Sequence, residues 1–452
     1  MIRDPASFRD PAATVWRRYD GKLCREIKPE YFPVYDQFME KVYPELIDQE
    51  LIIPHRIIGR KDELLTIEPE IVPFISYPYE WTFETLKKAA LVTLKINEIA
   101  LDYGLMLKDA SAYNIQSYQG RMRLIDTTSF MRYSGDTPWP SYSQFLRHFV
   151  CPLLWIKYYN PSLGRLSEIY LDGIPVPLTA RMLPMETRLI GRFWSHIFFQ
   201  SGLIGIFKED FVGDHKRQIK MSNISLKAFL ADLYKFVSKL NYSPVMDAGW
   251  LKYAEAGSYS KISLESKKEI VAKCLTGVRN GLRVLDLGAN TGVYSRLAVE
   301  LGYTVLAVDS DHDCLLLLKD EHRILPLVVD LCNPSPAIGW GNQERRAFWD
   351  RVGNIGTIMA LALVHHLSVR NNIPLGMVAE LLAAHTDNLI IEWVPLEDKQ
   401  AQKLLGEKKI PEYSLPVFLA EFGRRFKSIR AFPIKDSGRV IYLMEGKNGL
   451  AG

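Results

Sequence analysis

The chain of 452 residues is too long for one ordinary hydrophobic core, so we expect two or three domains. Its residues are 48% hydrophobic and 24% charged, which is typical of a soluble globular protein, and the formal net charge of +4 is too small to favour nucleic acid or an anionic membrane as a partner. The five cysteines are scattered without a CxxC pair, which argues against a structural zinc site and a disulfide framework. We therefore expect a cytoplasmic protein without a metal centre of this kind, and the oligomeric state is left open.

The first 240 residues are predicted to begin with strands and to continue as helices. A hairpin is expected around Asp20-Gly21, a helix near residues 35–43, and extended segments broken by prolines over 64–81. The apolar spacing from Thr82 predicts a long helix that stops at Gly104. Helical character then dominates to about residue 240, and charged or polar residues in its most apolar segment argue against a membrane span. The N-terminus has no apolar stretch of the secretory type.

Three polar residues stand out in the stretches GLMLKDASAYNIQ and GRMRLIDTTSF of this half. Asp109, Asn114 and Asp126 follow one another at intervals of five and twelve residues, in a loop expected between short strands. Two carboxylates and an amide at this spacing can converge on Mg²⁺ and a transferring phosphoryl group. The alternative is that they are turn and capping residues, which Asp and Asn often are.

These stretches resemble the catalytic loop and the metal-binding aspartate of protein kinases and aminoglycoside-type phosphotransferases. The resemblance covers residues 15–239 and implies an α+β, two-lobed fold, with Mg-ATP held by Asn114 and Asp126 and the acceptor oriented by Asp109. The sequence departs from the pattern at Leu107, where a histidine is expected, and after Asp126, where two threonines follow. No glycine-rich phosphate loop is visible, and Arg25 or Lys28 would have to replace the usual lysine. An active kinase and a pseudokinase-like binding domain both remain open.

Strands and helices alternate after residue 241, which predicts an α/β domain with a mostly parallel sheet covered by helices. The last two strands are joined by a short turn and should form an antiparallel hairpin at the sheet edge. Seven strands are expected, over residues 283–287, 304–308, 325–329, 356–363, 388–393, 429–432 and 439–444.

The first of these strands runs into the loop Gly-Ala-Asn-Thr-Gly. Gly288 and Gly292 permit a tight turn and a close approach of a ligand to the backbone. Asp309 closes the next strand, 21 residues after Gly288, where a carboxylate can accept hydrogen bonds from both hydroxyls of a ribose. Asp330 closes the third strand, on the side where an adenine would lie. The combination predicts a nucleotide-like ligand at this edge of the sheet.

This pattern resembles the class I S-adenosylmethionine-dependent methyltransferases across residues 243–446, and it implies a Rossmann-like fold. The resemblance implies that Gly288, Asn290 and Gly292 pack against the methionine and ribose part of the cofactor, and that Asp286 helps to hold its amino group. Asp309 would bind the ribose and Asp330 the adenine side. An NAD site is the rival, but it requires G-x-G-x-x-G, and the glycine spacing here does not match.

The methyl acceptor is expected near ALALVHHLSV and NLIIEWVP, at the ends of the fourth and fifth strands. A neutral imidazole of His365 or His366 can take a proton from the acceptor, and Glu392 can orient it. Because the two histidines are adjacent in sequence, at most one is expected to face the substrate. Alternatively, the His-His-Leu sequence only shapes the pocket.

We therefore predict two domains: residues 1–240, kinase-like or partner-binding, and residues 241–452, a methyltransferase. The predicted reaction moves a methyl group from S-adenosylmethionine to an oxygen or nitrogen of a small molecule, saccharide or natural-product-like acceptor. The alternatives are an ATP-dependent small-molecule kinase, a bifunctional kinase-methyltransferase, and a non-enzymatic nucleotide-binding module. The two-part organisation also resembles bacterial nodulation-associated methyltransferase-like proteins, on stretches such as LKDASAYNIQ, SYPYEW, NPSPAIGW and LALVHHL.

Overall fold

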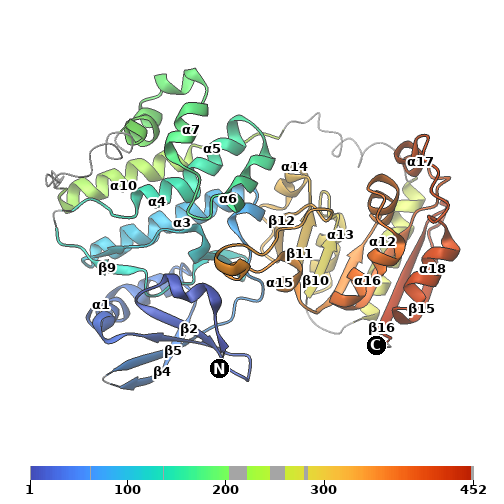
Figure 1. Cartoon of the computed structure of the whole chain (residues 1–452), viewed down its shortest axis with the longest axis horizontal. Helices are drawn as coiled ribbons and strands as arrows, with labels where there is room; N and C mark the ends of the chain where they lie inside the picture. Colours follow the sequence, from blue (N-terminus) through green and yellow to red (C-terminus); the bar gives the residue numbers. More distant parts are fainter. Residues whose placement is uncertain are drawn as a thin grey trace. The chain divides into compact units, whose positions relative to one another are not determined.

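The computed structural model of the protein describes residues 2–61, 63–135, 137–202, 221–244, 260–278 and 283–448. The chain forms two compact units (Figure 1). The first unit comprises Met1–Ser243 together with Ala337–Arg346, and the second comprises Pro244–Pro336 and Ala347–Gly452.

The first unit begins with an antiparallel sheet in the order β1-β2-β3-β5-β4, five strands within the described ranges. These strands are β1 (Ile2–Arg3), β2 (Ala13–Arg17), β3 (Leu23–Ile27), β4 (His55–Lys61) and β5 (Leu64–Pro69). A helical segment joins β3 to β4, where helices α1 (Phe32–Gln37) and α2 (Tyr43–Asp48) flank the π-turn η3 (Phe38–Val42). Tyr35, Phe38, Val42 and Leu46 are buried along it at intervals of three to four residues, which is one face of a helix. The predicted helix near residues 35–43 is confirmed.

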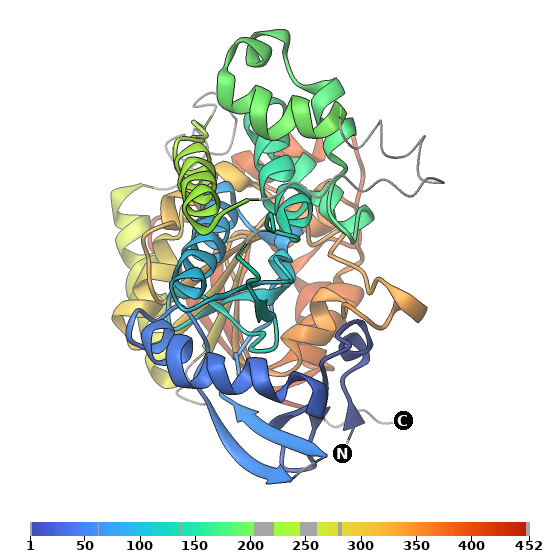
Figure 2. The same ribbon diagram turned by 90° about the vertical axis from the view of Figure 1, so that its left-hand side faces the viewer.

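Most of the other described elements of the first unit are helices, and Figures 1 and 2 show the sheet in blue at one end of this unit and the cyan-to-green helices at the other. The long helix α3 (Phe83–Asp102) begins where the Thr82 hydroxyl accepts a hydrogen bond from the Thr85 amide at 3.3 Å. It ends before Gly104, whose φ of +73° suits the left-handed turn, as predicted. The other helices are α4 (Tyr142–Phe145), α5 (Cys151–Tyr158), α6 (Leu166–Ile169), α7 (Val176–Met182), α8 (Gly191–Phe193) and α10 (Asn223–Ser238).

Two small strand pairs lie in the first unit directly after α3. Strand β6 (Leu105–Leu107) pairs with β9 (Phe130–Arg132), and β7 (Ile115–Tyr118) pairs with β8 (Arg121–Leu124), both antiparallel. The segments between these strands contain Asp109, Asn114 and Asp126. The pairing of β6 with β9 therefore brings together two loops that are well separated in sequence.

The segment Ala337–Arg346 packs within the first unit, although the chain around it belongs to the second. Glu344 accepts two hydrogen bonds from Arg9, at 2.7 Å from Nε and 3.2 Å from Nη2, and its side chain is only 1% exposed. The Arg345 guanidinium carbon lies 4.2 Å from the centre of the Tyr113 ring, and the Arg346 amide donates to the Tyr77 hydroxyl at 3.0 Å. A charge-assisted pair, a cation–π contact and a hydrogen bond thus hold this segment.

The second unit is built on a sheet in the order β12-β11-β10-β13-β14-β16-β15, seven strands within the described ranges (Figure 1). Strands β10 to β14 are parallel, and β16 runs antiparallel to both β14 and β15. The strands are β10 (Arg283–Leu287), β11 (Thr304–Asp309), β12 (Ile324–Val328), β13 (Ile355–Ala360), β14 (Thr386–Trp393), β15 (Phe426–Pro433) and β16 (Val440–Lys447). The predicted Rossmann-like α/β sheet with a terminal antiparallel hairpin is confirmed.

Helices connect the parallel strands of this sheet, and its core consists of the apolar side chains of the central strands. Val284, Ala307, Met359 and Leu443 are each at most 1% exposed and belong to one hydrophobic cluster, because buried parallel strands carry apolar residues on both faces. The helices are α12 (Lys261–Gly277), α13 (Val293–Glu300), α14 (His312–Leu315), α15 (Phe348–Val352), α16 (Leu375–His385), α17 (Lys399–Leu405) and α18 (Leu415–Gly423).

Among the described residues, no helix is long and apolar enough to cross a lipid bilayer. In the apolar segment that starts at residue 189, Phe193 and Ile197 are buried whereas Trp194 is 54% exposed. The described part of this segment, up to residue 202, is therefore helical with one buried and one exposed side, and the rest of the segment lies outside the described residues.

Candidate functional site

The strand order of the second unit places a topological switch point between β10 and β13. From β10 the chain moves outward through β11 and β12, and it then returns to add β13 and β14 on the other side. In open α/β sheets, ligands bind beyond the carboxyl ends of the strands at such a point. The loop after β10 lies there, because a Cβ placed on Gly288 would be 3.3 Å from Cδ1 of Leu363, which follows β13.

The loop Gly288–Gly292 turns through backbone conformations that most residues avoid. The φ angles are +72° at Gly288, 48° at Asn290 and +78° at Gly292, all in the region that favours glycine and tolerates asparagine. A Cβ at Gly292 would also lie 2.3 Å from Cδ2 of Leu318. The amides of Gly288 and Ala289 both donate to the Val308 carbonyl, at 2.8 and 3.0 Å, which holds the loop against the end of β11.

Asp309, at the end of β11, lies directly beside this loop. Its Oδ2 accepts a hydrogen bond from the Asn290 amide at 2.8 Å, and its Oδ1 accepts one from the Asp311 amide at 2.9 Å. Burial raises the pKa of this carboxyl above its ordinary value, and the backbone hydrogen bonds only partly oppose the shift. Because an ionised carboxylate has about four acceptor positions, each oxygen can accept a further hydrogen bond. Two such oxygens fit the two neighbouring hydroxyls of a ribose.

The other two predicted cofactor acids differ in their surroundings. Asp286 on β10 is 3% exposed and accepts a hydrogen bond from the Ser295 hydroxyl at 2.6 Å. Burial raises the pKa of Asp286 to about 6; the charge of Asp309 adds to this rise, whereas the hydrogen bond from Ser295 opposes it. Asp330 is exposed two residues beyond β12, where its Oδ1 accepts from the Cys332 amide at 2.9 Å. Since β10, β11 and β12 are parallel, all three acids lie at or near the same edge of the sheet.

The two histidines after β13 are not equivalent. His365 is fully buried, and neither of its ring nitrogens has a hydrogen-bond partner among the described residues. Burial lowers its pKa to about 2, helped by the charges of His366, Arg439 and Lys267, so the imidazole is neutral at physiological pH. His366 is half-buried with its ring centre 4.2 Å from that of His365, and burial together with Arg370 lowers its pKa to about 4. His365 is thus the more deeply buried of the two, and both of its ring nitrogens are without a hydrogen-bond partner among the described residues.

Glu392, at the end of β14, is fully buried and already faces two cations. Its Oε2 lies 2.7 Å from Nζ of Lys267, and its Oε1 lies 3.3 Å from Nη1 of Arg439. Arg439 also donates from Nε to Asp398 at 2.9 Å. The substrate-orienting role of Glu392 stays a prediction, and its contacts with Lys267 and Arg439 are those of a buried ionic network.

Lys267 and Arg439 were missed by the analysis of the sequence, although a signal for Lys267 exists. On α12 the buried residues Ser263, Lys267, Val271 and Cys274 follow at helical spacing, so the lysine belongs to the inner face. A lysine on an apolar face requires an acidic partner, because an unpaired buried charge is costly. The partner is 125 residues away in sequence, and the sequence gives no indication of which acid it is.

In the first unit, Asp109, Asn114 and Asp126 are brought together as the loop spacing predicts. Asn114 Nδ2 donates to the Ser129 hydroxyl at 3.4 Å, and that hydroxyl donates to Oδ2 of Asp126 at 2.7 Å. Asp109 accepts from the Gln144 amide group at 2.8 Å. Burial raises the pKa of Asp109, and the nearby charge of Asp126 raises it further. The three side chains form one polar cluster.

The donor set of this cluster does not fit Mg-ATP as it stands. Asp126 accepts hydrogen bonds from Arg25, from the Thr128 amide at 3.0 Å and from the Ser129 hydroxyl. Burial would raise the pKa of Asp126, but Arg25 and the hydrogen bonds from Ser129 and Thr128 outweigh it and lower the pKa to about 2. Across the described ranges, no group of three or more His, Cys, Asp or Glu side chains is arranged to hold a metal ion.

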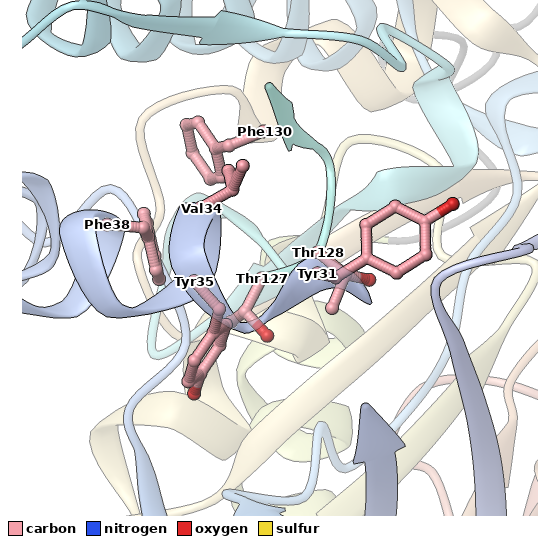
Figure 3. Close-up of a pocket in the computed structure, with 7 residues that line it drawn as sticks. All are labelled: Tyr31, Val34, Tyr35, Phe38, Thr127, Thr128 and Phe130. Atoms are coloured by element: carbon pink, nitrogen blue, oxygen red, sulfur yellow. The ribbon is translucent and has the colours of Figure 1, made fainter. Parts of the chain in front are cut away.

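A small pocket adjoins this cluster, and Figure 3 shows the side chains that line it. The rings of Phe38 and Phe130 stack with their centres 4.6 Å apart, and the Tyr35 hydroxyl is 2.7 Å from Nε2 of His55. The lining residues are Tyr31, Val34, Tyr35, Phe38, Thr127, Thr128 and Phe130. The two threonines that replace the expected Phe-Gly pair therefore form part of a largely aromatic wall next to Asp126.

Comparisons with known proteins show where this chain has relatives. It is 28% identical over 464 residues to nodulation protein NoeA of Rhizobium meliloti (strain 1021), which covers 98% of this chain and 96% of the relative. No family model matches the chain. The predicted resemblance to bacterial nodulation-associated proteins is confirmed over almost the whole length.

Methyltransferases are among the solved structures similar to this chain. Magnesium protoporphyrin IX methyltransferase from Synechocystis PCC 6803 with bound S-adenosylmethionine is 13% identical with a TM-score of 0.27, over 59% of this chain and 99% of that one. The bifunctional kinase-methyltransferase WbdD is 15% identical with a TM-score of 0.29, over 47% of this chain and 46% of that one. This chain thus spans about half the length of WbdD.

Proposed function

We propose that the second unit binds S-adenosylmethionine and transfers its methyl group to an oxygen or nitrogen of a small molecule, saccharide or natural-product-like acceptor. The observation that carries this proposal is the contact of Asp309 with the Gly288–Gly292 loop at the switch point of the sheet. There a carboxylate is held by two backbone amides and keeps acceptor capacity on both oxygens.

The chemical types of the site residues and their positions at the sheet edge both suit this cofactor. Asp309 would accept hydrogen bonds from the ribose hydroxyls, and Asp330 would lie on the adenine side. Asp286, buried beneath the loop with a raised pKa, would gain from a positively charged amino group. The five cysteines are all unpaired, which supports the reducing cytoplasm as the setting that we propose.

S-adenosylmethionine supplies an electrophilic methyl group, so the acceptor must present a nucleophilic atom in line with it. Because the pKa of His365 is about 2, its imidazole is a weak base. We propose that His365 accepts a hydrogen bond from the O–H or N–H of the acceptor and thereby orients its lone pair. His366 would shape the pocket wall. Alignment, rather than proton abstraction, would then account for most of the rate.

The replacement Asp309→Ala tests the proposal directly. In the wild-type protein, S-adenosylmethionine at about 100 times its dissociation constant should stabilise the second unit by about 2.7 kcal/mol in thermal unfolding. The variant should lose this stabilisation. The control Asp350→Ala removes an exposed carboxylate from α15 and should retain it. Undiminished binding by Asp309→Ala, or stabilisation by NAD alone, would contradict the proposal.

The role of His365 is tested by methyl transfer rather than by binding. Labelled methyl groups should pass from S-adenosylmethionine to an acceptor in fractionated small-molecule or glycan pools. His365→Phe should lower this transfer while the affinity for S-adenosylmethionine stays within about threefold, because the residue would contact only the acceptor. A variant with full transfer activity would show that His365 does not face the acceptor.

For the first unit we propose a kinase-like fold. The support is its topology, a five-stranded antiparallel sheet followed by helices and the β6–β9 and β7–β8 pairs, with Asp109, Asn114 and Asp126 between those strands. An ATP-dependent kinase is the second candidate function, and it predicts ATP turnover that Asp126→Ala abolishes. A non-enzymatic nucleotide-binding module predicts no turnover by either unit.

A further inference from the structure

We propose that the guanidinium of Arg25 is the resident cation of the Asp126 cluster, so that it takes the position a divalent metal ion would need. On this view the first unit is a metal-independent binding unit rather than a Mg-ATP enzyme. The proposal concerns the first unit only and does not depend on methyl transfer by the second.

Arg25 is fixed at the centre of the sheet of the first unit. It lies in the middle of β3, where it is paired with Val15 of β2 on one side and with Ile67 of β5 on the other. Its side chain is 14% exposed and that of Asp126 is 13% exposed, so the pair is largely withdrawn from water. A backbone held on both sides gives the guanidinium little freedom to withdraw from the carboxylate.

The same guanidinium nitrogen serves two acceptors of the cluster. Nη1 of Arg25 contacts Oδ1 of Asp126, and it lies 3.2 Å from the Thr128 hydroxyl. The Thr128 hydroxyl is also 2.8 Å from Oδ1 of Asp126 and 2.8 Å from Oδ2 of Asp10. Arg25 therefore organises the segment after β8 together with the N-terminal part of the chain.

The carboxylate of Asp126 has little capacity left for a metal ion. Its Oδ1 contacts three donors, which are Arg25, the Thr128 amide and the Thr128 hydroxyl, and its Oδ2 accepts from the Ser129 hydroxyl. Of the roughly four acceptor positions of the carboxylate, one on Oδ2 therefore stays open. Mg²⁺ requires an oxygen at about 2.0–2.1 Å in octahedral geometry and binds few protein groups to begin with. A metal ion at Oδ1 would have to displace Arg25, and a metal ion at Oδ2 would meet the positive charge that Arg25 holds on the other oxygen of the same carboxylate.

Asp109, the second acid of the cluster, also accepts hydrogen bonds from neighbouring residues. Oδ1 of Asp109 accepts hydrogen bonds from the Ser111 amide at 2.9 Å and from the Gln144 side chain at 2.8 Å. A metal ion shared by the two acids would therefore have to compete with hydrogen-bond donors at both of them.

The decisive experiment removes the resident cation and asks whether a metal site appears. Binding of Mn²⁺, as a probe for Mg²⁺, would be followed by electron paramagnetic resonance on the full-length chain. The wild-type protein should bind no Mn²⁺ at this site, and thermal unfolding of the first unit should be the same with ATP whether or not Mg²⁺ is present. Arg25→Gln, which is neutral but still offers a hydrogen bond to Asp126, should gain Mn²⁺ affinity by about tenfold or more. This gain should vanish in Arg25→Gln/Asp126→Asn.

Two matched variants define the effect. Arg25→Lys keeps a cation in place and should remain without Mn²⁺, whereas Arg17→Met removes an exposed arginine from the neighbouring strand β2 and should behave as the wild type. The proposal is overturned if the wild-type chain binds Mn²⁺ or Mg-ATP in a manner that Asp126→Asn abolishes. It is equally overturned if folded Arg25→Gln gains no Mn²⁺ affinity. Should Arg25→Gln fail to fold, the titration of the wild type with Mn²⁺ and Mg-ATP decides alone.

Discussion

Asp309 and Asp126 are two aspartates in corresponding situations that the chain uses differently. Asp309 ends strand β11 and Asp126 lies two residues after β8, and both accept a hydrogen bond from the amide two residues further on. Asp309 has no cationic partner among the described residues, whereas Asp126 is paired with Arg25. The comparison shows that an aspartate can bind a ligand only if its carboxylate oxygens still have open hydrogen-bond acceptor positions. Residue type alone does not determine how many positions are open.

The pKa values of Asp309 and Asp126 also differ, in the direction that their different partners predict. In the second unit the pKa values of Asp286 and Asp309 are raised, mainly by burial. In the first unit the pKa of Asp126 is lowered, because Arg25 and three hydrogen bonds outweigh burial. A buried carboxyl with a raised pKa gains most from donors that arrive with a ligand. Asp286 and Asp309 of the second unit meet this condition, as does Asp109 of the first unit, whereas Asp126 does not.

The largest expected effect comes from breaking the buried ionic network of the second unit, in which Glu392 contacts Lys267 and Arg439. Glu392→Met should destabilise the second unit by about 3–5 kcal/mol, because Lys267 would be left buried without its carboxylate. Denaturant unfolding monitored on the second unit measures this loss. The first unit should unfold as in the wild type.

The double variant Lys267→Met/Glu392→Met provides the control for that prediction. Arg439 keeps its hydrogen bond to Asp398 in this variant, so no buried cation lacks a partner and most of the lost stability should return. Glu300→Met, an exposed acid at the end of α13, should have an effect within about 0.5 kcal/mol. A loss below about 1 kcal/mol in Glu392→Met would mean that the network does not hold the cations as the contacts indicate.

The next largest effect is a pair of opposite pH dependences. The folded pKa of Asp286 is about 6 against an ordinary value of 3.8, so its contribution to stability is fully present below pH 4 and is lost as the pH rises through 6. The folded pKa of Asp126 is about 2, so its contribution is present above pH 4 and is lost as the pH falls towards 2. Each shift corresponds to about 2–3 kcal/mol.

These slopes are measured as differences between the wild type and Asn variants. The free energy of unfolding of the wild type relative to Asp286→Asn should rise as the pH falls from 7.5 to 4. Relative to Asp126→Asn it should fall as the pH decreases from 4 to 2. The buried histidines titrate in both members of each pair and cancel. Slopes of the same sign would refute the contrast between the two acids.

The sequence predicts the second unit well because its signals are local. Alternating apolar strands and helices indicate the α/β sheet, and the glycines of the Gly288–Gly292 loop are needed where φ is positive. The helix from Thr82 to Gly104 is equally readable, since its cap and its terminating glycine are adjacent to it. In each case the residues that determine the structure lie within a few positions of the structure they determine.

The sequence could not show which polar side chains are already paired. Arg25 and Asp126 are 101 residues apart, and their contact depends on how β3 is placed relative to the β6–β9 pair. His365 and His366 are neighbours with identical side chains, yet only His365 is fully buried without a hydrogen-bond partner among the described residues. Long-range pairing therefore determines which candidate residues remain available, and local patterns carry no information about it.

The smallest expected effect distinguishes the exposed acid of the cofactor edge from the buried one. Asp330→Asn should weaken S-adenosylmethionine binding by about 2- to 10-fold, which is the value of one hydrogen bond of about 0.5–1.5 kcal/mol. The stability of the second unit should change by less than about 0.5 kcal/mol, because Asp330 is exposed and Asn can still accept from the Cys332 amide. Calorimetric titration beside thermal unfolding separates the two quantities.

The comparison variant is Asp309→Asn, which changes the same chemical group at the end of the neighbouring strand. It should weaken binding more than Asp330→Asn, because Asp309 presents two acceptor oxygens beside the loop and an amide presents only one. If the two variants weaken binding equally, both acids contact the ligand in a similar way. The contribution of each acid to binding would then not depend on its solvent exposure. If Asp330→Asn is the more severe, the ribose lies nearer to β12 than to β11. The open acceptor positions of Asp309 would then not be the main determinant of cofactor binding.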